Sequence, residues 1–229
     1  MAASVPSSIA SGETRWHVGF ISELARTLRP EVYVELGIHT AELFNMVVPF
    51  ADRAIAVDMD PAAGRYVSNA SNAHFFCGTT DSFLAETALS GLGIDMLFID
   101  ADHSRESVLR DFRGYFPHVR PQGLILLHDS DPDAELIDPD WCGDGYLAVE
   151  ELSRDTTSYE MVTIPLSPGL TICRKRTQQL SWREPHSGGM RPAQWGLHGD
   201  ADGAFVSPSK ADSKWLCDLA RRVRARLHL

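Results

Sequence analysis

Short apolar runs that alternate with helix-like segments constrain this chain more than any other feature. Five such runs indicate strands, over residues 31–37, 54–60, 74–78, 94–100 and 123–129. Each is rich in Val, Ile, Leu or Phe, as expected for strands buried on both faces of a parallel sheet. The alternation predicts an α/β protein with a mostly parallel sheet.

The segments before and between these strands are expected to form helices. Before the first strand, apolar residues recur at helical spacing and a proline follows: Val18, Ile21, Ala25, Leu28 and Pro30. Further helices are expected from Thr40 to Pro49, from Pro61 onward, and over 81–90, 104–116 and 146–153. Pro61 suits the first turn of its helix, because an N–H is not needed there.

The last two predicted strands, 159–166 and 169–176, are separated only by Ser-Pro. That connection is too short for a crossover helix, so the two strands must be antiparallel. Five βα units and this terminal hairpin predict a doubly wound, seven-stranded sheet with one reversed strand. We expect residues 1–176 to form this domain and residues 177–229 to form a C-terminal arm.

The predicted arm ends in an amphipathic segment, residues 214–229. Its apolar stripe comprises Trp215, Leu219, Val223 and Leu227, and its basic residues are Lys214, Arg221, Arg222, Arg224 and Arg226. We expect the stripe to pack on the domain or on a second copy of the chain, giving a homodimer. The alternative is a basic helix that lies on an anionic membrane.

The charge balance argues against a nucleic-acid partner. The 229 residues contain 21 Lys+Arg and 31 Asp+Glu, for a formal net charge of −10. A nucleic-acid binder would need a basic surface to neutralise phosphates. The arm carries +3, so residues 1–176 carry −13, and much of this acidity follows the predicted strands.

The termini and the cysteines indicate a cytoplasmic protein. The first 16 residues lack the positive and apolar regions of a signal peptide. No apolar run approaches the ~20 residues that span a bilayer. The cysteines are far apart and form no C-x-x-C pair, which favours buried free thiols in a reducing compartment: Cys77, Cys142, Cys173 and Cys217.

The ends of the first two strands carry candidate ligand-binding residues. In open α/β sheets, ligands bind beyond the carboxyl ends of the strands, where strand order reverses. Gly37 follows the first strand and would let the backbone approach a ligand, although it also suits an ordinary βα turn. Asp58 ends the second strand, where a carboxylate can bind both hydroxyls of an adenosine ribose. Its alternative role is that of a solvated turn residue beside Asp60.

The ends of the later strands carry further acids. Asp81 follows the third strand and could contact a ligand base or cap a helix. Asp100 and Asp129 end the fourth and fifth strands, which as neighbours would lie about 4.8 Å apart. Two carboxylates so close require a proton or a cation between them, and Mg²⁺ is the default. The alternative is that Asp102 or Ser104 caps the next helix while Asp129 is a loop acid.

Four segments stand in a characteristic order along the chain: VELGIHTAEL, AIAVDMDP, FIDADHSRESVLRDF and VRPQGLILLHDS. Together they resemble class I S-adenosylmethionine-dependent O-methyltransferases. Their order and spacing over residues 20–176 are most similar to the branch related to metal-dependent sugar and natural-product O-methyltransferases. The resemblance implies a Rossmann-like methyltransferase fold and methyl transfer from S-adenosyl-L-methionine to a hydroxyl.

The resemblance also implies roles for individual residues. Glu35 and Gly37 match the motif that faces the methionine part of the cofactor, Asp58 matches the ribose ligand, and Asp81 lies beside the adenine. The complete implied cofactor set is Glu35, Gly37, Thr40, Asp58, Met59, Asp81 and Asp100. One departure is Ala41, which stands where a glycine is common.

The implied catalytic residues are Asp100, His103 and His128, and the implied metal ligands are Asp100, His128 and Asp129. His103 stands where related enzymes of the catechol type have a lysine base, and a neutral imidazole can serve that role near pH 7. His128 replaces a carboxylate of the metal site, so it could be the base instead. Either arrangement predicts Mg²⁺ or another divalent cation beside a histidine base.

The acceptor implied by this branch is a small molecule with a hydroxyl, first of all a carbohydrate or a glycosylated metabolite. Aromatic residues of the loops could form a lid over it or pack the arm on the domain: Trp141, His186, Trp195 and His198. Two other functions share the same sheet. An NAD(P)-dependent oxidoreductase would also use Asp58 but should show a fuller glycine motif, and a methyltransferase-like interaction module would have no turnover.

Overall fold

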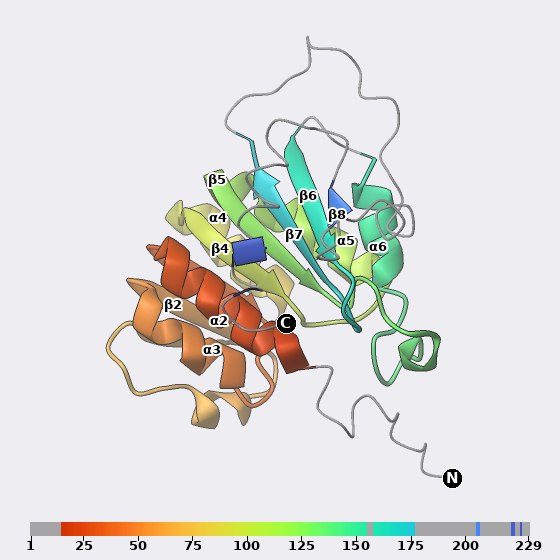
Figure 1. The fold of residues 1–229 in the computed structure, drawn as a ribbon. Helices are drawn as coiled ribbons and strands as arrows, with labels where there is room; N and C mark the ends of the chain where they lie inside the picture. The colour runs from red at the N-terminus through yellow and green to blue at the C-terminus, as the bar shows by residue number, and fades with distance from the viewer. Residues whose placement is uncertain (1–14, 155–157, 177–204, 207–220, 223–224, 226–229) are drawn as a thin grey trace.

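The computed structural model describes residues 15–154, 158–176, 205–206, 221–222 and 225. Its strands form one twisted sheet in the order β3-β2-β1-β4-β5-β7-β6-β8 (Figure 1). The strands are β1 Val32–Leu36, β2 Arg53–Asp58, β3 Ala73–Cys77, β4 Ile94–Ile99, β5 Val119–His128, β6 Tyr159–Ile164, β7 Leu170–Lys175 and β8 Phe205–Val206. β1 to β5 pair in parallel, and β7 runs antiparallel to both of its neighbours.

Helices cover both faces of the sheet. The α-helices are α2 Trp16–Leu28, α3 Glu42–Val47, α4 Thr80–Ser90, α5 Arg105–Tyr115 and α6 Tyr146–Leu152, and the short 3₁₀ helices are η2 Val48–Phe50, η3 Ala63–Tyr66, η4 Phe116–His118 and η5 Ala134–Leu136. α2 and α3 lie on one face and α4, α5 and α6 on the other (Figure 1). Each face has its own apolar core, one beneath α2 and α3 and one beneath α5 and α6.

The predicted fold class is confirmed. All seven predicted strands are present, the last two are antiparallel, and β7 is the one reversed strand among these seven. β8 adds a two-residue strand that pairs with β6, within the region predicted as an arm. β5 begins four residues before the predicted start and shifts its register against β4 between Ile94 and Met96.

The prediction of an α-helix after Pro61 is wrong. The chain forms a turn and the short helix η3 before β3 begins. Gly64, Ser68, Asn69, Ser71 and Asn72 have low helix propensity, which outweighs the favourable proline. Gly64 also packs so tightly on Phe75 that a Cβ atom would lie 2.6 Å from the ring.

Several predictions fall outside the described residues. These concern His186, Trp195, His198, Cys217 and the apolar stripe of the closing segment. In the part of the chain that is described, no helix combines the length and apolarity needed to cross a membrane.

Candidate active site

A hollow of about 460 Å³ lies beyond the carboxyl ends of β1, β2 and β4. Strand order reverses at β1, whose neighbours are β2 and β4, so this is the expected place for a ligand in a doubly wound sheet. Five of the seven residues predicted to bind the cofactor line it: Glu35, Gly37, Thr40, Asp58 and Asp100. Arg15 of the α2 N-terminus also lines the hollow and forms an ion pair with Glu42 of α3.

The loop after β1 depends on its glycine. Gly37 has φ of +81°, and a Cβ atom there would lie 2.3 Å from the backbone oxygen of Asp100. Only glycine allows β1 and β4 to approach so closely. Ala41, the departure from the family pattern, precedes α3 with φ of +55°. This left-handed conformation costs an alanine more than a glycine, but the residue is small enough to adopt it.

Asp58 connects the loops that follow β1 and β2. Its Oδ2 accepts hydrogen bonds from the backbone N–H groups of Ile38 at 3.1 Å and His39 at 3.3 Å. Its Oδ1 accepts one from the N–H of Asp60 at 2.9 Å. Asp58 is therefore a turn residue, as one prediction had it, and also lines the hollow, as the other required.

Glu35 is a buried carboxyl group at the base of this hollow. It is 3% exposed, and its Oε2 accepts a hydrogen bond of 2.6 Å from the hydroxyl of Tyr33. Burial raises the pKa of Glu35 to about 8; the Tyr33 hydrogen bond acts in the opposite direction, and the charge of Asp100 raises it further. The protonated form of this side chain is therefore favoured near neutral pH.

The ends of β4 and β5 form a cluster of acids and histidines. Ligand atoms of Asp100, His103 and Asp129 all lie within 4.8 Å of one another. Asp129 is 5% exposed, and its Oδ2 lies 2.5 Å from Nδ1 of His103. This hydrogen bond raises the pKa of His103, although burial opposes the change. The two strand-end acids therefore meet, as the neighbouring strands predicted.

His128 lies between the same two carboxylates. Its Nδ1 is 3.0 Å from Oδ1 of Asp100 and 2.9 Å from Oδ1 of Asp129. Its Nε2 is 3.1 Å from Nδ1 of His17. Burial alone would lower the pKa of His128, but the two carboxylates outweigh burial and raise it well above its ordinary value. The ring of His128 thus contacts both acids at the place where the sequence predicted a metal ion.

Two other predicted cofactor residues lie away from this hollow. The side chain of Met59 is 75% exposed, and it does not line the hollow. Asp81 lies in the first turn of α4, where it pairs with Arg110 at 3.2 Å. The cap of α4 is Thr79, whose side chain accepts a hydrogen bond from the N–H of Ser82.

Ser104 is the residue that caps the helix after β4, one of the two candidates for this role. Its hydroxyl oxygen accepts a hydrogen bond from the N–H of Ser107 at 3.3 Å and begins α5. Asp102 supports the same turn, since its Oδ1 accepts a bond from the N–H of Ser104 at 2.9 Å. Hydrogen bonds from Ser104 and from the side chain of Ser107 lower the pKa of Asp102 against the effect of burial, so this carboxyl group is ionised at neutral pH.

A second hollow, of about 520 Å³, also has His103 in its wall. It is formed with the segment between β5 and α6, and its lining is Asp102, His103, Ser104, Ile137, Asp138, Pro139, Gly143 and Asp144. Three carboxylates, but no Lys or Arg among the described residues, line it. Trp141, for which the sequence leaves a lid role or a packing role open, lies in this segment but is not part of either lining.

Sequence reasoning missed His17 and the position of Cys142. His17 of α2 lines the first hollow and reaches a residue 111 positions away, so no local pattern could reveal the contact. Its only signal is that it precedes Val18, the first residue of the apolar stripe. Cys142 is a buried free thiol, as expected; burial and a hydrogen bond to Asp129 raise its pKa.

Comparisons with known proteins agree with this architecture. A family model described as a methyltransferase domain matches residues 34–130. The chain is similar to a Staphylococcus aureus protein described as a caffeoyl-CoA O-methyltransferase, with TM-score 0.58 and 15% identity over 74% of this chain and 90% of the other. An O-methyltransferase from Bacillus cereus, in complex with SAH, gives TM-score 0.53 and 13% identity over 77% and 84%. A search of curated proteins gave no significant match.

A further similar structure limits what the fold can show. The N-methyltransferase NodS from Bradyrhizobium japonicum gives TM-score 0.53 and 13% identity over 74% of this chain and 99% of the other. The same sheet therefore serves different acceptor atoms, and fold alone does not decide between them. The family model supports the resemblance to methyltransferases over residues 34–130, and the solved structures support the predicted fold.

Proposed function

We propose that the chain is an S-adenosyl-L-methionine-dependent O-methyltransferase with His103 as its general base. The methyltransferase family model, the fold and the similar B. cereus enzyme with bound SAH support the cofactor. The assignment of His103 as the base depends on the 2.5 Å contact between its Nδ1 and Oδ2 of the buried Asp129.

The first hollow suits the proposed cofactor. Its acidic residues Glu35, Asp58 and Asp100 favour a ligand with a cationic sulfonium and an ammonium group. We assign the ribose hydroxyls to Asp58, whose hydrogen bonds to three backbone N–H groups hold the carboxylate in place. The protonated Glu35 would lose its proton when the cofactor's positive charge approaches.

His103 is placed to act between the two hollows. Because Nδ1 faces Asp129, its Nε2 remains for the acceptor, and the ring lines both the cofactor hollow and the second hollow. Nε2 takes the proton of the acceptor hydroxyl while that oxygen bonds to the methyl carbon and the carbon–sulfur bond breaks. Asp129 orients the ring and stabilises the imidazolium that forms. Much of the acceleration would come from holding the oxygen and the methyl group in line.

His128 is less suited to be the base. Both of its ring nitrogens already have partners within the protein, in Asp100, Asp129 and His17. The structure thus favours His103 among the two histidines that the sequence left open.

The acids and histidine at the ends of β4 and β5 could also bind a divalent cation. This gives a second, metal-assisted form of the proposed mechanism. Asp100, His103 and Asp129 together offer two carboxylate oxygens and one imidazole nitrogen. Mg²⁺ or another divalent cation there would polarise the acceptor hydroxyl, and the nitrogen donor suits Mn²⁺ or Zn²⁺ better than Mg²⁺. His103 would have to release Asp129 to bind the cation, so it could not act as base in the same way.

The second hollow indicates the class of acceptor. Its ionised Asp102, with Asp138 and Asp144, can accept hydrogen bonds from hydroxyl groups, while Ile137 and Pro139 offer an apolar wall. These features support the proposed carbohydrate or glycosylated acceptor. An acceptor that carries phosphates would be repelled by the same carboxylates.

The decisive experiment measures methyl transfer to a panel of hydroxylated acceptors, with and without EDTA. The proposal expects turnover with neutral glycosides, and loss of about 10²- to 10⁴-fold in H103A. Full activity in EDTA would refute the metal-assisted form, and activity restored only by added metal would refute the metal-free form. If calorimetry shows binding of NADH but not of S-adenosylhomocysteine, the chain is an oxidoreductase instead.

The proposal includes a reducing location and a homodimer. Among the described residues, Cys77, Cys142 and Cys173 are free thiols, which suits the cytoplasm. The homodimer rests on the apolar stripe of residues 214–229 in the sequence. Sedimentation of the full chain and of a chain ending at residue 206 tests it, and a monomer in both would refute it.

A further inference from the structure

The helix α2 brings an additional histidine into contact with the acid–histidine cluster. Nδ1 of His17 lies 3.1 Å from Nε2 of His128, and the two ring centroids are 4.1 Å apart. The ring of His17 also stacks on Phe98 of β4, with centroids 6.3 Å apart and an interplanar angle of 26°. His17 therefore meets the ends of both β4 and β5, although it precedes the segment that matches the family model.

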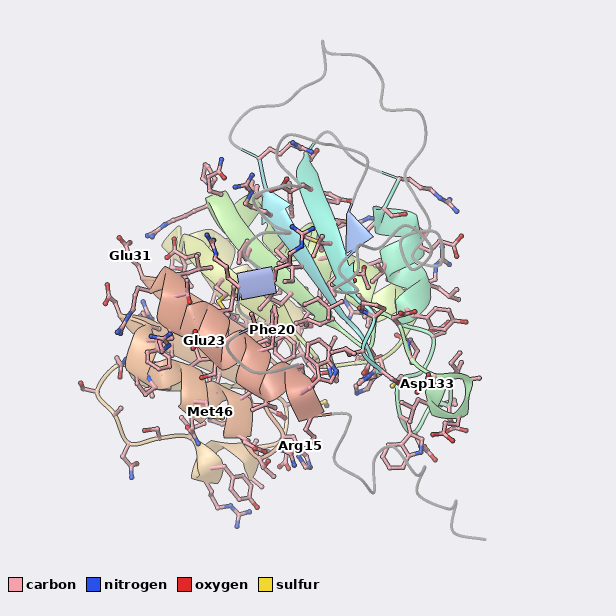
Figure 2. All side chains as sticks on the ribbon, viewed as in Figure 1. Arg15, Phe20, Glu23, Glu31, Met46 and Asp133 are labelled. Carbon is pink, nitrogen blue, oxygen red and sulfur yellow. The ribbon has the colours of Figure 1, made fainter. Side chains whose placement is uncertain are left out.

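The first turn of α2 is fixed on both sides of His17. The indole N–H of Trp16 donates to the backbone oxygens of Leu166 at 3.0 Å and Ser167 at 3.2 Å, in the turn between β6 and β7. Phe20, one turn later, is fully buried between α2 and the sheet (Figure 2). These anchors hold the imidazole of His17 at one place above His128.

His17 is a suitable hydrogen-bond partner for His128. Its Nδ1 must donate a proton to Asp100 and Asp129, because an ionised carboxylate can only accept. Its Nε2 then carries a proton in the charged ring and a lone pair in the neutral ring. An imidazole can accept from the first and donate to the second, so His17 can hold His128 in either protonation state.

We propose that His17 is a positioning residue for His103, acting through His128 and Asp129. His128 binds Oδ1 of Asp129 at 2.9 Å, while His103 binds Oδ2 of the same carboxylate at 2.5 Å. If the ring of His128 turned away, Asp129 could rotate and His103 would lose its fixed orientation. This inference rests on the proposed function, since it assumes that His103 is the base.

Two substitutions separate the hydrogen bond of His17 from its shape. His17→Phe keeps a planar ring on Phe98 and His128 but has no nitrogen. His17→Asn places an amide group near the position of Nδ1 and can both donate and accept. We expect H17F to lower kcat about 10- to 100-fold with the KM for the acceptor changed no more than a few-fold. H17N should recover most of kcat, and H74N, on the exposed His74 of β3, is the matched control.

A spectroscopic measurement tests the same contact without any turnover. In protein labelled with ¹⁵N-histidine, the ring signals of His128 are assigned by their loss in H128N. H17F should shift the Nε2 signal and speed the exchange of the Nδ1 proton, whereas H17N and H74N should leave both near wild type. The result stands even if no methyl transfer is found, so a failure of the proposed function is distinguishable.

Three outcomes would overturn the inference. The first is a set of His128 ring signals in H17F that matches the wild type. The second is a loss of kcat in H17N as large as that in H17F. It would show that the ring shape of His17, and not its hydrogen bond, supports kcat. The third is a wild-type kcat in H17F from an enzyme that shows methyl transfer.

Discussion

At the scale of single residues, Asp129 joins the two histidines of the candidate site. One of its oxygens faces His128 and the other faces His103. Its backbone has φ of +53°, a conformation that Asp and Asn adopt more readily than most residues. The buried carboxylate is strongly favoured in its ionised form, because the two histidines lower its pKa despite burial. This one side chain therefore fixes both rings.

Asp129→Asn tests that role without disturbing the backbone. The amide keeps the shape and tolerates the positive φ, but it removes the charge that orients His103 and stabilises its protonated form. We expect kcat to fall about 10²- to 10⁴-fold, measured by methyl transfer at saturating cofactor. D133N, in the exposed loop after β5 (Figure 2), serves as the control and should keep wild-type activity. An active D129N enzyme would exclude His103 as a base oriented by Asp129.

Glu35 predicts a pH-dependent stability. Its pKa is about 8 in the folded chain and near 4.5 when unfolded, so the folded state binds the proton more tightly. The contribution of Glu35 to the free energy of unfolding therefore falls as pH rises from 4.5 to 8, by on the order of 2–4 kcal/mol. In Glu35→Gln, which still accepts from Tyr33, this fall should disappear.

Urea denaturation of the wild type and of E35Q at pH 5, 6.5 and 8 measures the effect. The difference between the two proteins isolates Glu35 from every other titrating group. E35Q should gain stability relative to the wild type as pH rises. A difference that stays constant over this range would contradict the raised pKa.

At the scale of elements, α5 depends on its N-terminal cap. Ser104 accepts the N–H of Ser107, and the helix packs Phe112 into the core beneath it. Ser104→Ala should lower the free energy of unfolding by about 1 kcal/mol, measured by urea denaturation. S90A, at the C-terminal end of α4, should change it by less than about 0.5 kcal/mol. Equal effects of the two changes would show that the cap contributes nothing specific.

The elements also show how far the sequence can predict this fold. The parallel strands were predictable because buried runs and helical segments alternate, and the reversed strand because Ser167 and Pro168 leave no room for a helix. The structure of the segment after Pro61 was not predictable, because the packing of Gly64 on Phe75 is a tertiary contact. Pairing of β8 with β6 likewise joins residues more than 40 positions apart.

Some contacts of the candidate site are likewise predictable from the sequence and others are not. Asp100 and Asp129 could be brought together from sequence, since the ends of neighbouring parallel strands share one edge. The contact between His128 and His17 could not be predicted, because it depends on where α2 packs. The resemblance implied that His128 lies beside the two acids as a metal ligand, but not that its ring contacts both carboxylates directly.

At the scale of the whole molecule, the hollow at the reversal of strand order joins parts of the chain that are far apart. Its lining comes from α2, from the loops after β1 and β2, and from the end of β4. A ligand bound there would hold these elements together, and only the folded chain presents them. Ligand binding should therefore stabilise the entire domain rather than one loop.

Thermal unfolding with candidate cofactors tests this directly. A ligand at 100 times its Kd adds about 2.7 kcal/mol to the free energy of unfolding. For a chain of this size we expect S-adenosylhomocysteine to raise Tm by about 5–10 °C. Asp58→Asn keeps the loop hydrogen bonds on one oxygen but weakens the proposed ribose contact, so its shift should be smaller. Because ligand-induced stabilisation requires binding but no acceptor, a shift with NADH and none with S-adenosylhomocysteine would overturn the cofactor assignment whatever the acceptor is.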